Sequence, residues 1–531
     1  MSTSRCDTLT EDAAETQAPR RLAGFLAENL EDDVVGTGSP IHVAPPALGR
    51  TIASVPGATA EDVRRAAERT RAARVAWSER PAAARAAVLL RLHGEIRRHE
   101  ALLLDTIQAE TGKSRIHAYD EIMDAYNVCR FVGREAPRVL REERRRGAIP
   151  GLTRTIVQHS PVGTVGFITP WNYPVSLGGT DLLSALAAGN AVMHKPDSAT
   201  ILSAILMRRL AVAAGLPSDV WQLVPGAVDD VGDTLIETAD AVSFTGSTAA
   251  GRGIASKTGH KLTPTTLELG GKNPMIVCSD ASLEAAVDGA VRGSFSSTGQ
   301  LCLSLERIYV VGDLYEKFCE RLAEATAALR LGFSFDHRHD VGSLISEAHL
   351  ERVRDAGANA TRSGARVLAG GSTRPDLGPC FFEPTVLTDV PHEAPIATEE
   401  TFGPVVAVWR VESDDEAIAR ANGTAYGLNA SVYSGSRSHG LEVASRLHSG
   451  MVNINEAFAA AWGSIAAPSG GWKASGLGHR HGPEGILEFT RSRTIARQSL
   501  TPIAPSGPLD PPTFQRVMTS ALGAMKTLGL K

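Results

Sequence analysis

AVMHKPDSATILSAILMRRLAVAAGLPSDVWQLVPGAVDDVGDTLIETADAVSF, residues 191–244, alternates short apolar runs with longer segments in which apolar residues recur at helical spacing. Short apolar runs predict buried strands, and the longer segments predict helices. The expected strands are 191–194, 220–224 and 241–244, and the expected helices between them are 199–214 and 231–239. This alternation predicts a parallel sheet covered by helices, so the fold class is α/β.

The alternation continues on both sides of this stretch. Upstream, 82–108 predicts one long helix, and downstream 273–277 predicts a further strand of the same sheet. A second alternation begins near residue 283, with a helix at 283–295 and a strand at 307–311. Because 531 residues are too many for one hydrophobic core, we expect two α/β domains.

Composition and charge exclude several classes of protein. The chain has 54 Lys and Arg against 59 Asp and Glu, a net charge of −5, so we expect no nucleic-acid partner. The run 141–146 is locally basic, and a solvated helix end explains it better than a phosphate-binding patch. No apolar stretch is long enough for a transmembrane helix, so stable membrane insertion is not expected.

The first residues and the cysteines indicate a cytoplasmic protein. Residues 1–20 are polar and acidic and lack an apolar core, so we expect a disordered segment rather than a secretion signal. The six cysteines form no Cys-x-x-Cys pair and no His cluster accompanies them, so neither a disulfide framework nor a metal site is expected.

Gly299-Gln300-Leu301-Cys302 follows a run of small residues after a predicted helix. Glycine lets the backbone bring a thiol close to a ligand, and a thiolate is a strong nucleophile. An inert buried thiol fits the same local sequence, and taken alone it is the better explanation of Cys302.

Three further stretches could belong to an active site. Glu268 is flanked by apolar residues and followed by two glycines, so burial could raise its pKa and make it a general base. Asn172 lies between Pro170 and Pro174, where its amide could donate to an oxyanion. Phe244-Thr245-Gly246-Ser247 ends a strand and opens a helix, a place that binds phosphates. In isolation, a turn before a strand is the better explanation of Glu268, and a rigid loop and an ordinary helix cap explain the other two stretches equally well.

Together and in this order, these motifs resemble the aldehyde dehydrogenase superfamily, over about residues 50–500. The stretches that carry the resemblance are Pro170-Trp171-Asn172-Tyr173-Pro174, Lys195-Pro196, Phe244-Thr245-Gly246-Ser247, Glu268-Leu269-Gly270-Gly271-Lys272, Gly299-Gln300-Leu301-Cys302, Glu400-Thr401-Phe402-Gly403-Pro404 and Gly470-Gly471-Trp472-Lys473-Ala474-Ser475-Gly476.

The resemblance implies the roles of three catalytic residues. Cys302 would attack the aldehyde to form a thiohemiacetal, and Asn172 and the Cys302 N–H would hold the oxyanion. After hydride transfer, Glu268 would activate the water that hydrolyses the thioester. A CoA-acylating relative would lack Glu268, and a structural protein of this fold should tolerate loss of Cys302 or Glu268.

The resemblance also implies NAD or NADP as cofactor. The implied cofactor-binding residues are Ile168, Trp171, Lys195, Ser198, Gly226, Phe244, Gly246, Ser247, Leu269, Glu400 and Phe402. Many members that prefer NAD carry a Glu where this chain has Ser198, and that Glu would repel a 2′-phosphate. We therefore expect NADP to be favoured, with Lys195 pairing with its phosphate.

Within the superfamily, the sequence is most similar to the NADP-dependent succinate-semialdehyde dehydrogenase branch. Some of these enzymes carry an Arg six positions before the Cys, where this chain has Ser296. Another semialdehyde, or a broader range of aldehydes, therefore stays an alternative to succinic semialdehyde. The expected walls of the aldehyde pocket are Tyr173, Leu301, Leu303, Phe458 and Trp462. A second departure is Arg480, which stands where many relatives carry a Glu that helps a proton to leave.

The resemblance implies a Rossmann-type cofactor domain, an α/β catalytic domain and a small β oligomerisation arm. The expected bounds are 21–148 and 162–279 for the cofactor domain, 280–488 for the catalytic domain, 149–161 and 489–503 for the arm, and 504–531 for a C-terminal tail. Because exposed strand edges pair with partners, a homodimer or homotetramer is expected.

Overall fold

The computed structural model describes residues 19–47, 49–507 and 509–529. It confirms the α/β class. Contacts between residues divide the chain into one large unit, Met1–Val139 with Pro161–Phe489, and one small unit, Leu140–Ser160 with Thr490–Lys531. The predicted disordered segment falls almost wholly within residues 1–18, outside the described residues, and a helix begins at Arg20.

A six-stranded sheet in the large unit forms from the stretch that predicted the fold. Its strand order is β19-β9-β8-β5-β6-β7. The bounds are β5 Thr164–Ile168, β6 Ala191–Lys195, β7 Trp221–Leu223, β8 Ala241–Thr245, β9 Thr265–Glu268 and β19 Gly476–Leu477. β5 to β9 pair in parallel, and β19 pairs antiparallel with β9. The carboxyl ends of five strands therefore share one edge, the usual place of a ligand site in such sheets.

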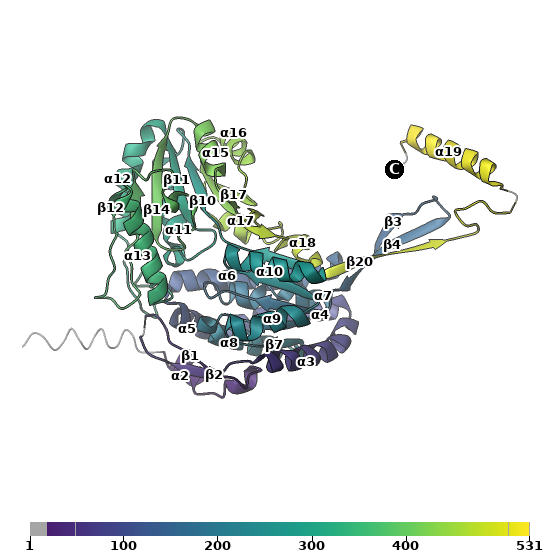
Figure 1. The fold of residues 1–531 in the computed structure, drawn as a ribbon, viewed down its shortest axis with the longest axis horizontal. Helices are drawn as coiled ribbons and strands as arrows, with labels where there is room; N and C mark the ends of the chain where they lie inside the picture. Colours follow the sequence, from purple (N-terminus) through teal and green to yellow (C-terminus); the bar gives the residue numbers. More distant parts are fainter. Residues whose placement is uncertain (1–18, 48, 508, 530–531) are drawn as a thin grey trace, which may run out of the picture. The chain divides into compact units, whose positions relative to one another are not determined.

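Helices pack against this sheet, as Figure 1 shows. Those that contact the strands or their apolar cluster are α3 Ala60–Glu79, α7 Leu183–Ala188, α8 Ile201–Ala213, α9 Val228–Thr238 and α10 Thr248–Lys261. The single helix expected at 82–108 is instead two, α4 Ala82–Arg98 and α5 Glu100–Thr111, because His99 leaves helical geometry at φ −111°, ψ 15°. α6 Arg115–Val139 packs against α4.

A seven-stranded sheet forms from the second alternation, in the order β12-β13-β14-β11-β10-β16-β17. Its strands are β10 Asn273–Val277, β11 Leu305–Val311, β12 Arg366–Ala369, β13 Thr385–Thr388, β14 Val405–Val411, β16 Asn429–Tyr433 and β17 Met451–Ile454. Its main helices are α11 Leu283–Phe295, α12 Tyr315–Ala327, α13 Glu347–Arg362, α15 Asp414–Asn422 and α16 Arg437–Ser445.

The predicted domain boundary at residue 279 is wrong for β10. The strand was expected to extend the first sheet, but it lies between β11 and β16 in the second. The chain crosses between the sheets at Gly270 and Gly271, immediately after β9. A continuous strand–helix pattern does not reveal such a crossing.

The small unit contains a three-stranded sheet and a helix. The strands are β3 Glu143–Arg146, β4 Thr153–Pro161 and β20 Thr490–Gln498, and the helix is α19 Pro511–Thr527. The basic run 141–146, expected as a helix end, is largely the edge strand β3, and the hairpin expected from residue 149 begins with it. Charged side chains suit an exposed sheet edge, which explains the strand.

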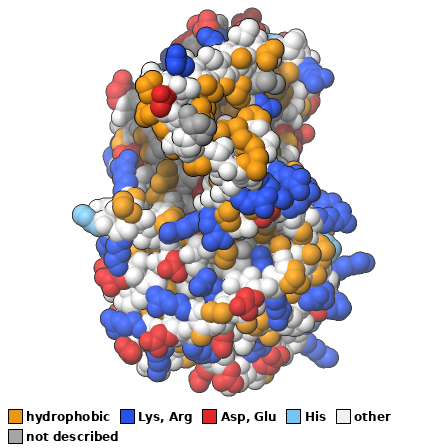
Figure 2. Space-filling view, turned by 90° about the vertical axis from the view of Figure 1, so that its right-hand side faces the viewer, with side chains coloured by type: hydrophobic (Ala, Val, Ile, Leu, Met, Phe, Trp, Pro, Cys, Tyr) orange, Lys and Arg blue, Asp and Glu red, His pale blue; other side chains and the backbone are white. Residues whose placement is uncertain are grey.

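The remaining elements are short. They are α2 Arg20–Leu26, β1 Pro40–Val43, β2 Ala53–Pro56, α14 Pro395–Thr398, β15 Tyr426–Gly427, α17 Ala459–Gly463, β18 Trp472–Lys473 and α18 Gly482–Leu487. On the face drawn in Figure 2, basic and acidic side chains both occur, with hydrophobic patches between them. Among the described residues, none of the helices is long and apolar enough to cross a membrane.

Candidate active site

The predicted cofactor residues gather at the carboxyl edge of the six-stranded sheet. Ile168 ends β5 and Lys195 ends β6. Phe244 lies near the end of β8, and Gly226 follows β7. Because these strands are parallel neighbours, residues far apart in sequence meet at one edge.

A cavity of about 430 Å³ opens at this edge. It brings together the three predicted catalytic residues and six of the predicted cofactor residues. Its lining includes Asn172, Glu268 and Cys302 together with Trp171, Gly246, Ser247, Leu269, Glu400 and Phe402. Ile168, Lys195, Ser198, Gly226 and Phe244 lie outside the lining of this cavity.

Cys302 is presented by a strained loop. The three residues Ser297, Thr298 and Gly299 all have positive φ, at 49°, 59° and 68°. Only glycine adopts this region without cost, so the surrounding contacts must hold the other two. The hydroxyl of Thr298 donates to the Gly342 carbonyl at 3.1 Å, and a Cβ on Gly299 would lie 2.2 Å from a backbone oxygen. These contacts hold the strained loop, and Cys302 at its end lines the cavity.

Asn172 and Asn273 fix the loop on either side of the thiol. The Asn172 Nδ2 donates to the Gln300 carbonyl at 2.9 Å, and the Asn273 Nδ2 donates to the Cys302 carbonyl at 2.7 Å. An amide nitrogen carries two protons, and Gln300 accepts one of those on Asn172. The second proton of the Asn172 amide is available to an oxyanion.

Glu268 ends β9 and is buried at 8% exposure. Burial raises the pKa of its carboxyl to about 7, against the opposing charge of Arg480. Its Oε1 has no hydrogen-bond partner within the protein. A carboxyl with a pKa near neutrality and a free oxygen has the properties of a general base.

The Cys302 thiol is not activated in this state. Burial raises its pKa to about 12, and Arg480 is the charge that opposes this shift. A thiol with this pKa needs a base to become a nucleophile at neutral pH. Glu268, which lines the same cavity, or water that enters the cavity can take this proton.

Glu400 and Phe402 reach the cavity from the loop before β14. A carboxyl oxygen of Glu400 accepts the Gly271 N–H at 2.8 Å. Behind the loop, the buried Glu306 carboxylate pairs with Lys272 and accepts the N–H groups of Thr401 and Phe402 at 2.9 and 3.0 Å. This ion pair links the loop to the Gly270–Gly271 crossing between the two sheets.

The residues present fit a dinucleotide. The amino end of α10 opens directly after Gly246, and Ser247 caps it by accepting the Ala250 N–H. Free N–H groups at a helix start attract phosphate oxygens. Glycine leaves room at two positions of the lining, since a Cβ on Gly246 would lie 2.5 Å from the Phe244 ring and one on Gly270 would lie 2.3 Å from the Glu400 carboxylate, so either neighbour would have to shift.

Comparison with known proteins agrees with this geometry. A family model described as the aldehyde dehydrogenase family matches residues 34–495. This chain belongs to the aldehyde dehydrogenase family. It is 45% identical over 480 residues to a protein of Mycolicibacterium smegmatis whose name provisionally assigns it as an NADP-dependent succinate-semialdehyde dehydrogenase, covering 90% of this chain and 93% of that protein. The predicted family and enzyme class are confirmed.

Solved structures share the fold over most of their length. An NADP-dependent enzyme of E. coli is 34% identical, with a TM-score of 0.84 over 89% of this chain and all of that chain. The betaine aldehyde dehydrogenase of Staphylococcus aureus, solved with NAD+, is 32% identical with a TM-score of 0.86, over 91% of this chain and 98% of that one.

The five residues expected to line the aldehyde pocket of this aldehyde dehydrogenase lie together. Tyr173, Leu301 and Leu303 belong to one buried apolar cluster, and Cys302, Phe458 and Trp462 pack against it. The Tyr173 hydroxyl pairs with Ser297 Oγ at 2.8 Å, and the Lys113 ammonium lies 3.9 Å from the centre of the Tyr173 ring.

Sequence reasoning missed several groups at the site. His349 and Arg352 of α13 line the cavity, and His349 pairs with the Phe402 carbonyl at 2.7 Å. Only their spacing on one helix face could have indicated them. Asp181 and Arg480 form a buried ion pair of 2.5 Å near Glu268, joining residues far apart in sequence.

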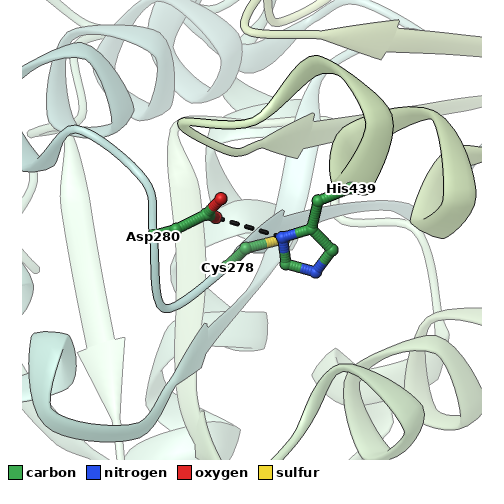
Figure 3. A group of neighbouring side chains, drawn as sticks. All are labelled: Cys278, Asp280 and His439. Atoms are coloured by element: carbon green, nitrogen blue, oxygen red, sulfur yellow. Dashed lines mark hydrogen bonds and ion pairs between the residues drawn. The ribbon is translucent and has the colours of Figure 1, made fainter.

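Within the part of the chain that the structure describes, one group of side chains away from this site has the chemistry of metal ligands. Cys278 and Asp280 follow β10, and His439 lies on α16 and points toward Asp280 (Figure 3). His439 bonds Asp414 at 2.6 Å and Asp280 at 3.2 Å, and these hydrogen bonds raise its pKa. We therefore interpret the cluster as a His ion-paired with two carboxylates and assign no metal to it.

Proposed function

We propose that this aldehyde dehydrogenase oxidises succinic semialdehyde to succinate with NADP as the hydride acceptor. The observation that carries the reaction is the single cavity that contains Cys302, Glu268 and the Asn172 amide. Nucleophile, base and oxyanion donor are the three groups that acyl transfer requires. The substrate follows from the relatives that are 45% identical over most of both chains.

The catalytic residues act in two stages. The Cys302 thiol gives up its proton to solvent as the sulfur attacks the aldehyde carbon, and the oxyanion accepts from the Asn172 amide and the Cys302 N–H. The bound dinucleotide supplies the acceptor for the hydride that leaves this carbon. Glu268 then takes a proton from water as the water attacks the thioester, and passes it to the departing sulfur, so that the carboxylic acid leaves and the Cys302 thiol is restored.

The residues proposed to hold the dinucleotide are those at the sheet edge. Gly246, Ser247 and the start of α10 would hold phosphate, and Glu400 and Phe402 would position the ribose beside the nicotinamide. Lys195 and Ser198 would face the adenosine ribose, where Ser198 leaves room for a 2′-phosphate. Lys195 is buried and its pKa is lowered by burial, so a phosphate partner would restore its charge.

The aldehyde would enter along Tyr173, Leu301, Leu303, Phe458 and Trp462. An aldehyde without a carboxylate is the second candidate. Two observations favour it: Ser296 replaces the Arg found in some relatives, and the nearby Asp124 is a buried carboxyl that accepts from Ser176 Oγ.

Initial rates across two aldehydes and two cofactors test the proposal. We expect kcat/KM for succinic semialdehyde to exceed that for propanal by at least about tenfold, because carboxylate recognition contributes a charge-assisted hydrogen bond of about 1.5–3 kcal/mol. We expect NADP to be used at least as well as NAD. Equal rates for the two aldehydes would reject the substrate, and a clear preference for NAD would reject the cofactor.

A matched pair of variants isolates the contribution of Ser198. Ser198→Glu places a carboxylate where the 2′-phosphate would lie, so kcat/KM for NADP should fall about tenfold while that for NAD is kept. Ser438→Glu, on the exposed start of α16, should change neither value. A uniform loss with both cofactors in Ser198→Glu would contradict the assignment.

We propose that the small unit is an oligomerisation arm and that the protein is a cytoplasmic homodimer or homotetramer. The strands β3 and β20 are sheet edges, and most side chains of β20 are exposed, Ile495 at 41%. A three-stranded sheet with so little buried surface is stable only against a partner. The described cysteines are all free thiols, as in a reducing compartment.

Light scattering tests the arm. The purified chain should have at least twice the mass of one 56.0 kDa chain, and Ile495→Asp should lower it toward one chain, because a buried carboxylate is costly at an interface. Arg491→Gln, at an exposed position of the same strand, is the control. A wild-type mass of 56.0 kDa would contradict the proposal.

A further inference from the structure

Arg480 is a buried cation that the two-stage reaction does not use. Its side chain is 10% exposed and pairs with Asp181, also 10% exposed, at 2.5 Å. A second hydrogen bond runs from Nη2 to Thr245 Oγ1 at 2.8 Å, and the guanidinium lies 5.8 Å from the centre of the Trp462 ring. Burying an unpaired arginine is costly, so the contacts with Asp181 and Thr245 stabilise the guanidinium in this position.

The strands place Arg480 beside Glu268. In the sheet, Thr245 of β8 stands directly opposite Glu268 of β9. Arg480 therefore donates a hydrogen bond to the residue next to the base on the neighbouring strand. On the other side of β9, Gly476 of β19 stands opposite Glu268, four residues before Arg480. The backbone of Arg480 is fixed as well, since its N–H donates to the Ser469 carbonyl at 2.7 Å.

Glu268 and Arg480 also share a second, small cavity. It has a volume of about 30 Å³, and its lining includes Glu268, Arg480, Asp181 and His481. Its lining also includes apolar side chains such as Phe131, Phe167 and Phe489, and its volume leaves room for about one or two waters beside the polar groups. Glu268 thus lines both this cavity and the larger one with Cys302, and its buried Oε1 has no hydrogen-bond partner within the protein.

Groups of both charges act on the Glu268 carboxyl. Arg480 is the cation, and it opposes the effect of burial on the pKa of both Glu268 and Cys302. The carboxyl of Glu488 acts against it on Glu268. Asp181 and Cys302 also face the site, but burial raises the pKa of Asp181 to about 8 and that of Cys302 to about 12. His481 has its pKa lowered to about 3 by burial and is neutral.

We propose that Arg480 is a positioning residue for the reaction: its guanidinium, fixed by Asp181 and Thr245, holds Glu268 in the ionised form in which it can accept a proton. The inference rests on the proposed role of Glu268 as the base. On this proposal, the activity of the chain at neutral pH depends on Arg480. Arg480 itself touches neither aldehyde nor dinucleotide in this scheme.

The test is the pH profile of ester hydrolysis by Arg480→Gln, with p-nitrophenyl acetate as the probe. The ester acylates Cys302 with release of nitrophenolate, and Glu268 then activates the water that frees acetate, so neither dinucleotide nor aldehyde is needed. The wild-type rate should rise with pH to a midpoint near 7. In Arg480→Gln the midpoint should move up by at least about one pH unit, and Arg480→Lys should restore it to within about half a unit.

Two further variants separate position from fold. Arg480→Gln combined with Asp181→Asn removes both members of the buried pair and leaves neither without its partner, so this double variant should fold and show the same upward shift. Arg321→Gln, exposed on α12, should leave the profile unchanged. A uniform fall in rate with the midpoint kept at 7 would overturn the role of Arg480. Loss of the pH-dependent limb in the wild type would instead overturn Glu268 as base.

Discussion

Replacing Cys302 with Ala should abolish aldehyde oxidation, with kcat lowered by at least about 10⁴-fold. Without the thiol no covalent intermediate forms, and water in the cavity is a far weaker nucleophile. Loss of the nucleophile in an acyl-transfer enzyme has an effect of this order or larger. The measurement is reduced-dinucleotide formation followed by absorbance at saturating aldehyde.

The fold and the dinucleotide site should survive the Cys302→Ala change. Cys302 is only partly buried, and its loop is held by Asn172, which donates to the Gln300 carbonyl, and by Asn273, which donates to the Cys302 carbonyl, rather than by the thiol. The melting temperature should stay within about 2 °C, and dinucleotide binding by fluorescence should be unchanged. Cys319→Ala removes a buried thiol on α12, distant from the lining of the cavity, and should keep activity. Turnover in Cys302→Ala above about 1% of wild type would contradict the assignment.

The sequence pattern predicted the parts of the fold that depend on local order. The strands at 191–194 and 241–244 match β6 and β8 closely, because short apolar runs between helices form buried strands in a parallel sheet covered by helices. The pattern failed at β10, which continues the same alternation but pairs in the other sheet. Pairing partners are decided by packing over long range, and two consecutive glycines look alike in a turn and in a crossing between sheets.

The candidate site was predictable to the extent that its motifs lie in short stretches. Asn172, Glu268 and Cys302 each stand in a distinctive stretch, and the resemblance supplied their roles. Arg480 was noticed only as a departure, and its partner Asp181 was not indicated at all. A buried ion pair between residues so far apart depends on how β19, α18 and the segment after Asn172 fold together, which no local pattern records.

The geometry of the loop before Cys302 could not be predicted from its sequence either. The sequence Ser296-Ser297-Thr298-Gly299 was notable only as a run of small residues, which gives no indication of strain. Instead, Ser297 and Thr298 adopt left-handed geometry that costs about 1–3 kcal/mol each, held by hydrogen bonds to Tyr173 and Gly342. The loop is stiff, and that stiffness is what keeps the thiol between Glu268 and Asn172.

Replacing Glu268 with Gln should separate the two stages of the reaction. Gln keeps the size of the side chain and can still hydrogen bond, but it cannot take a proton from water. Rapid mixing should therefore show a burst of reduced dinucleotide of up to one equivalent per site, followed by a steady rate at least about 10²-fold below wild type, the lower range for loss of a general base. Glu284→Gln, exposed in the first turn of α11, should show the wild-type progress curve.

The pH dependence decides whether Glu268 acts as the base. Since burial raises its pKa to about 7, the ionised form dominates only above that pH, so the wild-type steady rate should fall as pH drops through 7. Glu268→Gln should lose this limb, because the group that titrates is gone. If the variant gave no burst at all, Glu268 would be needed for the attack of Cys302 as well. Apart from Glu268, the only groups in the cavity lining that could take a proton from this thiol of pKa about 12 are Glu399, Glu400 and the neutral His349. If Glu268→Gln instead gave the same burst and the same steady rate as the wild type, another group would activate the water.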